Sequence, residues 1–175
     1  MNVQLTELIQ GLQGLEILGD TQVSIGQIRF DSRLVMPGDV FVAVRGVAVD
    51  GHQFIQTALE KGAQVIVCEE WTGEASATII KVKDSAEMLG QLASIFYGNP
   101  SGAFVLIGVT GTNGKTTTTT LLWQLFTALG YKCGLIGTVE NRIGDRIIPS
   151  THTTPDAVRL HALFREMADA GCSHV

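Results

Sequence analysis

The sequence contains few cysteines and no long apolar run. Its three cysteines, Cys68, Cys133 and Cys172, are too few and too scattered for a disulfide framework or a zinc site. This pattern favours a reducing compartment, so we expect a cytoplasmic protein. No segment approaches the roughly 18 apolar residues of a membrane span, and residues 1–10 lack the basic and apolar regions of a signal peptide. We therefore expect no membrane partner.

Positive charge and aromatic residues are also scarce. Twelve Lys and Arg stand against 17 Asp and Glu, which gives a net charge of −5, and aromatic residues make up 6% of the chain. This balance argues against a protein that binds nucleic acid through a basic surface. With 45% hydrophobic and 17% charged residues over 175 positions, the chain can bury a core. The remaining classes are an enzyme or a binding module of mixed α/β structure.

Helix and strand patterns alternate along the first half. Helical spacing predicts an amphipathic segment over residues 3–12, and alternating apolar and polar residues predict a strand over 24–30. Further strands are predicted at 40–44, 65–68 and 79–82, and helices over 54–62 and, with Asp84 or Ser85 as a cap, over 88–96. The run Gly98-Asn99-Pro100-Ser101-Gly102 then interrupts the pattern. We place a domain boundary here, between a domain at 1–98 and a domain at 99–175.

The second half begins with a predicted strand at 104–109, a glycine-rich turn and a helix over 121–129. A strand at 133–136, a hairpin over 139–148 and a helix with Thr154 as its N-cap follow, and the last four residues resemble the opening of another strand. A doubly wound sheet usually has about five or six strands. We therefore expect the chain to end inside an incomplete second domain.

The most informative motif is the run Gly108-Val109-Thr110-Gly111-Thr112-Asn113-Gly114-Lys115-Thr116. It lies between a predicted strand and a predicted helix, the context that a phosphate-binding loop (P-loop) requires. Glycines allow backbone N–H groups to turn toward phosphate oxygens, and the helix N-terminus adds partial positive charge. Lys115 would then reach the β- and γ-phosphates, and the Thr116 hydroxyl would be a ligand of Mg²⁺.

Two features of this motif depart from the common pattern. Val109 stands where a glycine is expected, because the glycine lies one position earlier, and no apolar strand ending in Asp follows to supply a second metal ligand. The alternative interpretation is a glycine-rich turn with an exposed lysine. Thr116 to Thr120 favour a functional role, since β-branched residues are poor helix formers and their presence at a helix start needs another reason.

The loop, in the form Thr110-Gly111-Thr112-Asn113-Gly114-Lys115-Thr116-Thr117-Thr118, resembles the nucleotide loop of the Mur ligases. Three further segments resemble the N-terminal domain of that family: Phe30-Asp31-Ser32-Arg33, Pro37 to Gly46, and Asp50-Gly51-His52 with Phe54. Gly137-Thr138-Val139 and Thr153-Thr154-Pro155 are most similar to the members that add the third amino acid of the cell-wall peptide. The resemblance covers nearly the whole chain and implies a small UDP-binding α/β domain followed by a truncated P-loop domain.

The resemblance also implies roles for individual residues. Phe30 and Ser32, with the loop Val47, Ala48 and Val49, match positions that contact the uridine-diphosphate end of the substrate. The ATP loop matches Gly111, Thr112, Asn113, Gly114, Lys115, Thr116 and Thr117, with Lys115 and Thr116 in catalytic roles and Thr116 on Mg²⁺. His152, Thr153 and Thr154 match positions that hold the muramoyl-peptide. Further ligands known in the family, including a carboxylated lysine, do not fall within these residues.

The activity implied is ATP-dependent formation of an amide bond in peptidoglycan synthesis. The parent protein would add a diamino acid, meso-diaminopimelate or L-lysine, to UDP-N-acetylmuramoyl-L-alanyl-D-glutamate through an acyl phosphate, while these residues alone would only bind. The alternatives are a D-Ala-D-Ala-adding Mur ligase, a folylpolyglutamate-type ligase, and a non-catalytic UDP-sugar or nucleotide-binding module. A regulatory P-loop switch is disfavoured, since no guanine-selecting motif is found.

Local chemistry leaves several polar residues open to two interpretations. Arg33 can bind phosphate in a forked geometry with Ser32 beside it, or it can pair with Asp31 to tighten a turn. Asp39 is interpreted as a turn residue, and His52 as a cap of the following helix. The cysteines are interpreted as small buried apolar residues, and Trp71 and Trp123 as packing residues.

Overall fold

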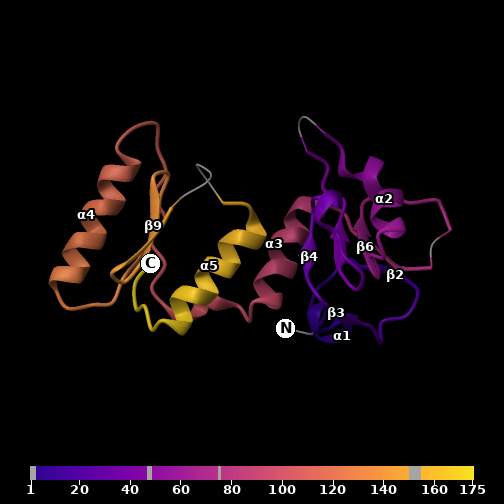
Figure 1. The fold of residues 1–175 in the computed structure, drawn as a ribbon, viewed down its shortest axis with the longest axis horizontal. Coiled ribbons are helices and arrows are strands. Elements are labelled where there is room, and N and C mark those ends of the chain that lie inside the picture. The colour runs from indigo at the N-terminus through magenta and orange to yellow at the C-terminus, as the bar shows by residue number, and fades with distance from the viewer. Residues whose placement is uncertain (1–2, 47–48, 75, 150–154) are drawn as a thin grey trace. The chain divides into compact units, whose positions relative to one another are not determined.

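The computed structural model describes residues 3–46, 49–74, 76–149 and 155–175. It divides into two compact units, Met1–Phe96 and Tyr97–Val175, which are considered separately below. The chain is drawn in Figure 1. Both units mix helices with sheets, so the fold class is α/β as the sequence predicts. Within the described residues, no helix is long and apolar enough to cross a membrane.

The first unit is built on a five-stranded sheet with the order β2-β7-β6-β5-β4. Strands β4 (Ile28–Arg29), β5 (Val40–Val42), β6 (Val65–Cys68) and β7 (Thr78–Lys81) run parallel, whereas β2 (Glu16–Leu18) pairs antiparallel with β7. The runs at β5 and β6 are buried along their whole length, as expected for parallel strands covered on both faces. Two short strands, β1 (Val3–Gln4) and β3 (Ser24–Ile25), form a separate antiparallel pair.

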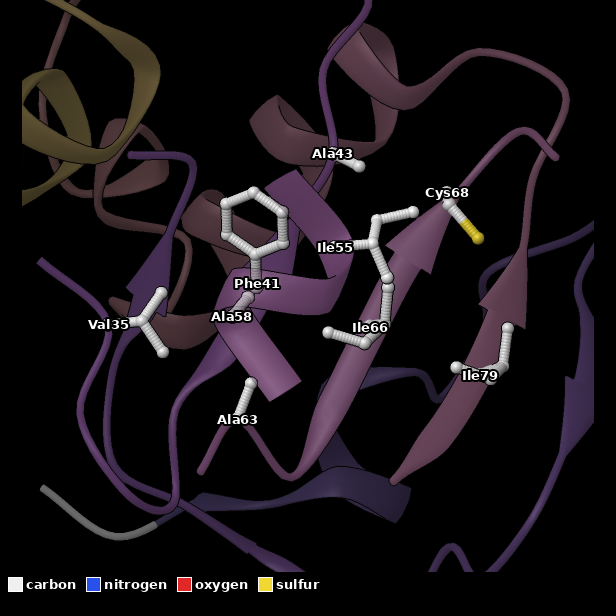
Figure 2. Close-up of a cluster of buried hydrophobic side chains, with 9 residues drawn as sticks. All are labelled: Val35, Phe41, Ala43, Ile55, Ala58, Ala63, Ile66, Cys68 and Ile79. Atoms are coloured by element: carbon white, nitrogen blue, oxygen red, sulfur yellow. The ribbon is translucent and has the colours of Figure 1, made fainter. Parts of the chain in front are cut away.

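Helices cover this sheet. A turn η2 (Gly51–Phe54) leads into α2 (Ile55–Glu60), and the α2 residues Ile55 and Ala58 pack against Phe41 and Ile66 of the sheet (Figure 2). Alternate strand residues point to the opposite face and are also buried, as are both leucines of α1 (Leu5–Leu8) and most apolar residues of α3 (Ser85–Phe96). The apolar pattern that predicted these strands and helices is therefore a pattern of core packing.

The strand predicted over residues 24–30 is interrupted. The backbone N–H of Gly26 donates to the carbonyl of Gly38 at 2.9 Å, and a Cβ at Gly26 would lie 3.1 Å from Oδ1 of Asp39. This close approach directs the chain from β3 into β4, which belongs to a different sheet. Asp39 is more than a turn residue, because its buried carboxylate also accepts from Nε of Arg29 at 3.2 Å and from the N–H of Met36 at 3.1 Å.

The second unit contains an antiparallel sheet with the order β10-β9-β8. Strands β8 (Gly134–Ile136), β9 (Glu140–Ile143) and β10 (Arg146–Pro149) include the predicted hairpin, which turns at Gly144. Residues 173–175 pair with residues 105–107 through three backbone hydrogen bonds of 2.8–2.9 Å, and the N–H of Gly134 donates to His174 at 2.8 Å. The strand predicted at 104–109 is therefore a short parallel bridge at Val105 rather than a full strand.

Two helices complete the second unit, after a short turn η3 (Pro100–Ala103): α4 (Lys115–Ala128) and α5 (Ala157–Asp169). The prediction that Thr154 caps α5 is wrong, because the N-cap is Asp156, whose side chain accepts from the N–H of Arg159 at 2.9 Å. Asp accepts this bond as well as Thr and its charge also favours the helix dipole. Phe164 and Met167 of α5 are buried in an apolar cluster with Ile143 and Cys172.

Candidate functional site

The glycine-rich loop leads directly into α4. Gly111 and Gly114 have φ angles of +151° and +79°, and the second lies in the left-handed region where a side chain is strained. Gly114 is the N-cap of α4, and its carbonyl accepts the first helical bond from Thr118 at 2.8 Å. The sequence folds this way because the glycines permit the bend and Lys115 can start a helix. The N–H groups of the first helical turn are therefore free of intrahelical partners.

The side chains of this loop are exposed, from Gly111 through Thr118. The ammonium of Lys115 contacts the carbonyl of Gly111 and lies 3.5 Å from that of Thr112, so it is folded back across the loop. The hydroxyl of Thr119 donates to carbonyls of its own helix, Lys115 at 3.0 Å and Thr116 at 3.1 Å. The structure therefore places Gly111 to Thr117 in one exposed bend that leads into the first turn of α4.

The carboxyl ends of the parallel strands form a second candidate region, in the first unit. Phe30 follows β4 and is 40% exposed, Ser32 is buried in the turn η1 (Ser32–Leu34), and Val49, in the segment after β5, is 56% exposed. Parallel strands place the segments that follow them at one edge of a sheet. The other predicted substrate residues, Val47, Ala48, His152, Thr153 and Thr154, lie outside the described residues.

The Asp31–Arg33 pair closes the turn η1. Nε and Nη2 of Arg33 donate to the Asp31 carboxylate at 2.9 Å and 2.7 Å, and the Arg33 N–H donates to it at 3.0 Å. The Arg33 side chain is 86% exposed. These hydrogen bonds hold the pKa of Asp31 below its ordinary value. Of the two interpretations offered by the sequence, the structure contains the turn-closing ion pair.

A polar network that the sequence did not predict lies at the same carboxyl edge. It contains Arg45 after β5, Asp50 and His52 in the following turn, Glu69 after β6, and Ser85 at the start of α3. His52 does not cap a helix, because the acceptor at the start of η2 is Asp50, which accepts from the N–H of His52 at 3.0 Å. The available signal was the position of Glu69 directly after the buried strand β6.

The cysteines and most aromatic residues pack rather than react. Burial raises the pKa of the Cys68 thiol to about 11, which makes the thiolate nucleophile scarce at neutral pH. Cys133 and Cys172 are also buried. Trp71 packs against the core of the first unit, and the Arg142 guanidinium lies 4.6 Å from the ring centre of Trp123, a cation–π contact.

Two family models match separate parts of the chain. The sequence model described as "Mur ligase family, catalytic domain" matches residues 24–97, and "Mur ligase middle domain" matches residues 109–175. The chain is 53% identical over 175 residues to a UDP-N-acetylmuramoyl-L-alanyl-D-glutamate–2,6-diaminopimelate ligase of Cytophaga hutchinsonii and 49% identical over 173 residues to the protein of the same name from Bacteroides thetaiotaomicron. In each comparison it covers 98% of its own length and 36% of the relative.

Solved structures give the same result. A structure of a UDP-N-acetylmuramoyl-L-alanyl-D-glutamate–2,6-diaminopimelate ligase matches 99% of this chain with a TM-score of 0.80 and 27% identity, and the chain covers 35% of it. A structure of MurF from Acinetobacter baumannii matches 95% of the chain, with a TM-score of 0.62 and 24% identity, and shows the fold alone. The chain spans about a third of the length of the curated relatives it matches. With both units matched in order by domains of one family, the chain belongs to the Mur ligases.

Proposed function

We propose that this chain is part of an ATP-dependent ligase that joins 2,6-diaminopimelate to UDP-N-acetylmuramoyl-L-alanyl-D-glutamate in peptidoglycan synthesis. The main support is the 53% identity, over nearly the whole chain, to a relative that carries this activity in its name. That relationship also favours diaminopimelate over L-lysine. It disfavours the D-Ala-D-Ala-adding and folylpolyglutamate alternatives. The 175 residues alone would bind ligands without turnover.

In this proposal the bend from Gly111 to Thr117 holds the triphosphate of ATP. The proposal is supported by the glycines at positive φ and by the N-terminus of α4, since such loops and helix starts offer backbone N–H groups to anions. Lys115 would leave the carbonyl of Gly111 and pair with phosphate oxygens. Phosphoryl transfer to the D-glutamate carboxylate depends mainly on positioning and on neutralising charge. The exposed loop supplies both kinds of group.

Mg²⁺ belongs to the same proposal. Thr116 is exposed at the first turn of α4 and offers one hydroxyl oxygen, while nucleotide phosphates commonly supply other oxygens to this ion. The described residues contain no cluster of three His, Cys, Asp or Glu side chains suited to a metal. This donor set fits an ion carried by ATP phosphates, and when bound that ion would neutralise their charge.

Phe30, Ser32 and the segment from Val47 to Val49 would receive the uridine-diphosphate end of the substrate. His152, Thr153 and Thr154 would hold its muramoyl-peptide. Of the first group, Phe30, Ser32 and Val49 are supported by their positions beyond β4 and β5 at one edge of the sheet. These two substrate regions would belong to different domains.

The experiment that tests this function removes the lysine of the loop in the intact enzyme. Phosphate release would be measured with ATP, UDP-N-acetylmuramoyl-L-alanyl-D-glutamate and diaminopimelate. The Lys115→Ala enzyme should lose activity by at least about 100-fold, since one preorganised electrostatic contact to the transition state is worth this much. The Lys132→Ala enzyme, changed at an exposed lysine outside the loop, is the matched control. Full activity of Lys115→Ala would refute the proposal.

A binding experiment separates the alternatives. Thermal unfolding of the intact enzyme would be measured with the muramoyl-dipeptide and, separately, with the muramoyl-tripeptide nucleotide. The ligand that binds the native state raises its unfolding temperature. Protection by the dipeptide supports the proposed step, and protection by the tripeptide alone supports a D-Ala-D-Ala-adding ligase.

A further inference from the structure

The turn that follows β5 is closed at both ends by backbone contacts. Arg45 and Asp50 form an antiparallel bridge, the N–H of Gly46 donates to the carbonyl of Val49 at 3.1 Å, and the N–H of Gly51 donates to Val44 at 2.8 Å. A Cβ at Gly46 would lie 2.8 Å from the Val49 oxygen, and one at Gly51 would lie 2.7 Å from the Val44 oxygen. A side chain at either glycine would force these backbone segments apart, so the two glycines allow their close approach.

Arg45 links this turn to the end of the neighbouring strand. Its guanidinium lies 3.5 Å from the carboxylate of Asp50, 3.3 Å from that of Glu69 and 3.8 Å from that of Glu70. The side chain is 46% exposed, whereas that of Glu69 is 18% exposed. A planar guanidinium can donate to several carboxylates at once, which a lysine ammonium does less well. Arg45 therefore connects residues 50 and 69 across the carboxyl edge of the sheet.

Glu69 extends the connection to α3. Its Oε1 accepts from the N–H of Ser85 at 3.1 Å and from its hydroxyl at 2.8 Å, and the Ser85 oxygen accepts from the N–H of Arg45 at 3.3 Å. Ser85 is fully buried. The bonds from Ser85, with a smaller contribution from Arg45, hold the pKa of Glu69 below its ordinary value, so this carboxylate stays charged. The three side chains close a ring through segments up to 40 residues apart.

His52 also links Asp50 and Glu69, through its two ring nitrogens. Its Nδ1 lies 2.6 Å from Oδ1 of Asp50, and its Nε2 accepts from the backbone N–H of Glu69 at 2.9 Å. Nε2 can accept only if it carries no proton, so Nδ1 must be the nitrogen that donates to Asp50. The geometry therefore requires neutral imidazole in the Nδ1–H form. Asp50 and Glu69 are its charged neighbours, and Arg45 pairs with both of them.

We propose that Arg45, His52 and Glu69 are positioning residues. They fix the backbone at Arg45, Gly46, Val49 and Asp50, beside which the uridine-diphosphate end of the substrate would bind. This rests on the proposed function. In this role the network acts through the backbone that it fixes, beside which Val49 stays exposed. Fixing the turn before binding removes an ordering cost from the binding step. The network thereby raises affinity for the nucleotide substrate without taking part in phosphoryl transfer.

Steady-state kinetics of the intact enzyme test this role. Arg45→Ala and Glu69→Gln should each raise KM for the UDP-muramoyl-dipeptide about tenfold, the size expected when one or two rotatable groups must be ordered on binding. KM for ATP and kcat should stay within about twofold, because the phosphate loop lies in the other unit. The double variant should be no worse than the more impaired single variant, since both break one network. Glu16→Gln, which breaks the exposed Lys81–Glu16 pair of the same sheet, is the matched control.

Two variants at His52 distinguish positioning from packing. His52→Gln keeps one donor and one acceptor and should restore most of the affinity, whereas His52→Phe keeps a planar ring without hydrogen bonds and should behave like Arg45→Ala. Nitrogen NMR of the imidazole in the unaltered enzyme gives a reading that needs no variant, and it should report a protonated Nδ1 and an unprotonated Nε2. A protonated Nε2 at neutral pH would overturn the assignment.

Calorimetric binding of UDP and of the UDP-muramoyl-dipeptide separates the two proposals. If the unaltered enzyme binds neither, the proposed function fails. If it binds them and the Arg45→Ala and Glu69→Gln enzymes bind equally well, the positioning role fails while the function stands. Variants that lose kcat and both affinities together, with a lower unfolding temperature, would show that the network only stabilises the fold.

Discussion

Helices α3 and α4 are of similar length and both carry many apolar residues, but they differ in burial. The 12-residue α3 in the first unit buries Met88, Leu92 and Phe96 among others, whereas the 14-residue α4 of the second unit buries none of its residues. Leu121, Leu125 and Leu129 along and just after α4 are all more than half exposed. The comparison teaches that an apolar pattern identifies the face of a helix to be covered, while burial depends on whether a covering layer is present.

The same contrast distinguishes the two candidate regions. At the carboxyl edge of the first unit, charged groups already have partners and the turn after β5 is closed. In the second unit, the phosphate loop is exposed and its lysine contacts only carbonyls of the loop itself among the contacts described. One region is organised before any ligand arrives, and the other has groups that an anion would reorganise.

The largest expected effect on stability comes from removing one apolar side chain from each unit in turn. Phe41 is fully buried and Leu125 is 53% exposed. Phe41→Ala should lower the free energy of unfolding of the first unit by about 3–5 kcal/mol, and Leu125→Ala should change that of the second by less than about 0.5 kcal/mol. The chain has two tryptophans, Trp71 in the first unit and Trp123 in the second. Denaturation followed by fluorescence in Trp123→Phe and Trp71→Phe backgrounds therefore reports each unit separately.

A large decrease in the free energy of unfolding of Leu125→Ala would contradict the comparison. It would mean that the apolar face of α4 is covered in solution, as it would be if the exposed leucines drive self-association. Light scattering on the same samples decides this, because a monomer and an assembly differ in mass.

Substitution of one glycine in each of the two helices should change stability by a smaller amount and in opposite directions. Gly90 lies within α3, and a Cβ there meets no atom within 4 Å, whereas Gly114 has φ +79° at the start of α4. Gly90→Ala should stabilise the first unit by about 0.5–1 kcal/mol, because alanine loses less backbone freedom in a helix. Gly114→Ala should destabilise the second by about 1–2 kcal/mol through left-handed strain. Thermal unfolding measures both, and equal signs would contradict the assigned backbone conformations.

The smallest expected effect is the loss of stability of the first unit in acid. Hydrogen bonds, chiefly from the His52 and Ser85 N–H groups, hold the pKa values of Asp50 and Glu69 below their ordinary values of 3.8 and 4.5. A carboxyl whose pKa is lowered by folding adds stability above its unfolded pKa, and that stability is lost as pH falls through the folded value. Below about pH 4.5 the first unit should therefore lose stability with a steeper pH slope than its Glu69→Gln variant. If stability falls with pH equally steeply in both proteins, Glu69 does not contribute to the pH dependence.

The sequence predicted local structure wherever pattern and packing agree. Strands β5 and β6 and helix α3 are apolar runs or stripes that pack into a core, and they were predicted correctly. Strand β2 was missed because Glu16, Ile17 and Leu18 form a short edge strand of intermediate or exposed residues. The split between β3 and β4 depends on the contact of Gly26 with the turn at Gly38, which no local pattern reveals.

The candidate site was predictable to a different degree in each unit. The phosphate loop is continuous in sequence, so its glycines, lysine and helix start could be identified together, although their ligand roles remain predictions. The network around Arg45 comes from three segments that meet only after the sheet has formed. Glu69 and Ser85 therefore carried no recognisable motif, and His52 was interpreted only as a local cap.

The pairing of residues 105–107 with residues 173–175 has a consequence for synthesis on the ribosome. The segment that leads into the phosphate loop finds its parallel neighbour about 70 residues later in the chain, a non-local contact of the kind that slows folding. Until that neighbour emerges, the nascent loop has no sheet to anchor it. The glycine-rich loop would thus be anchored only after the first unit has been synthesised.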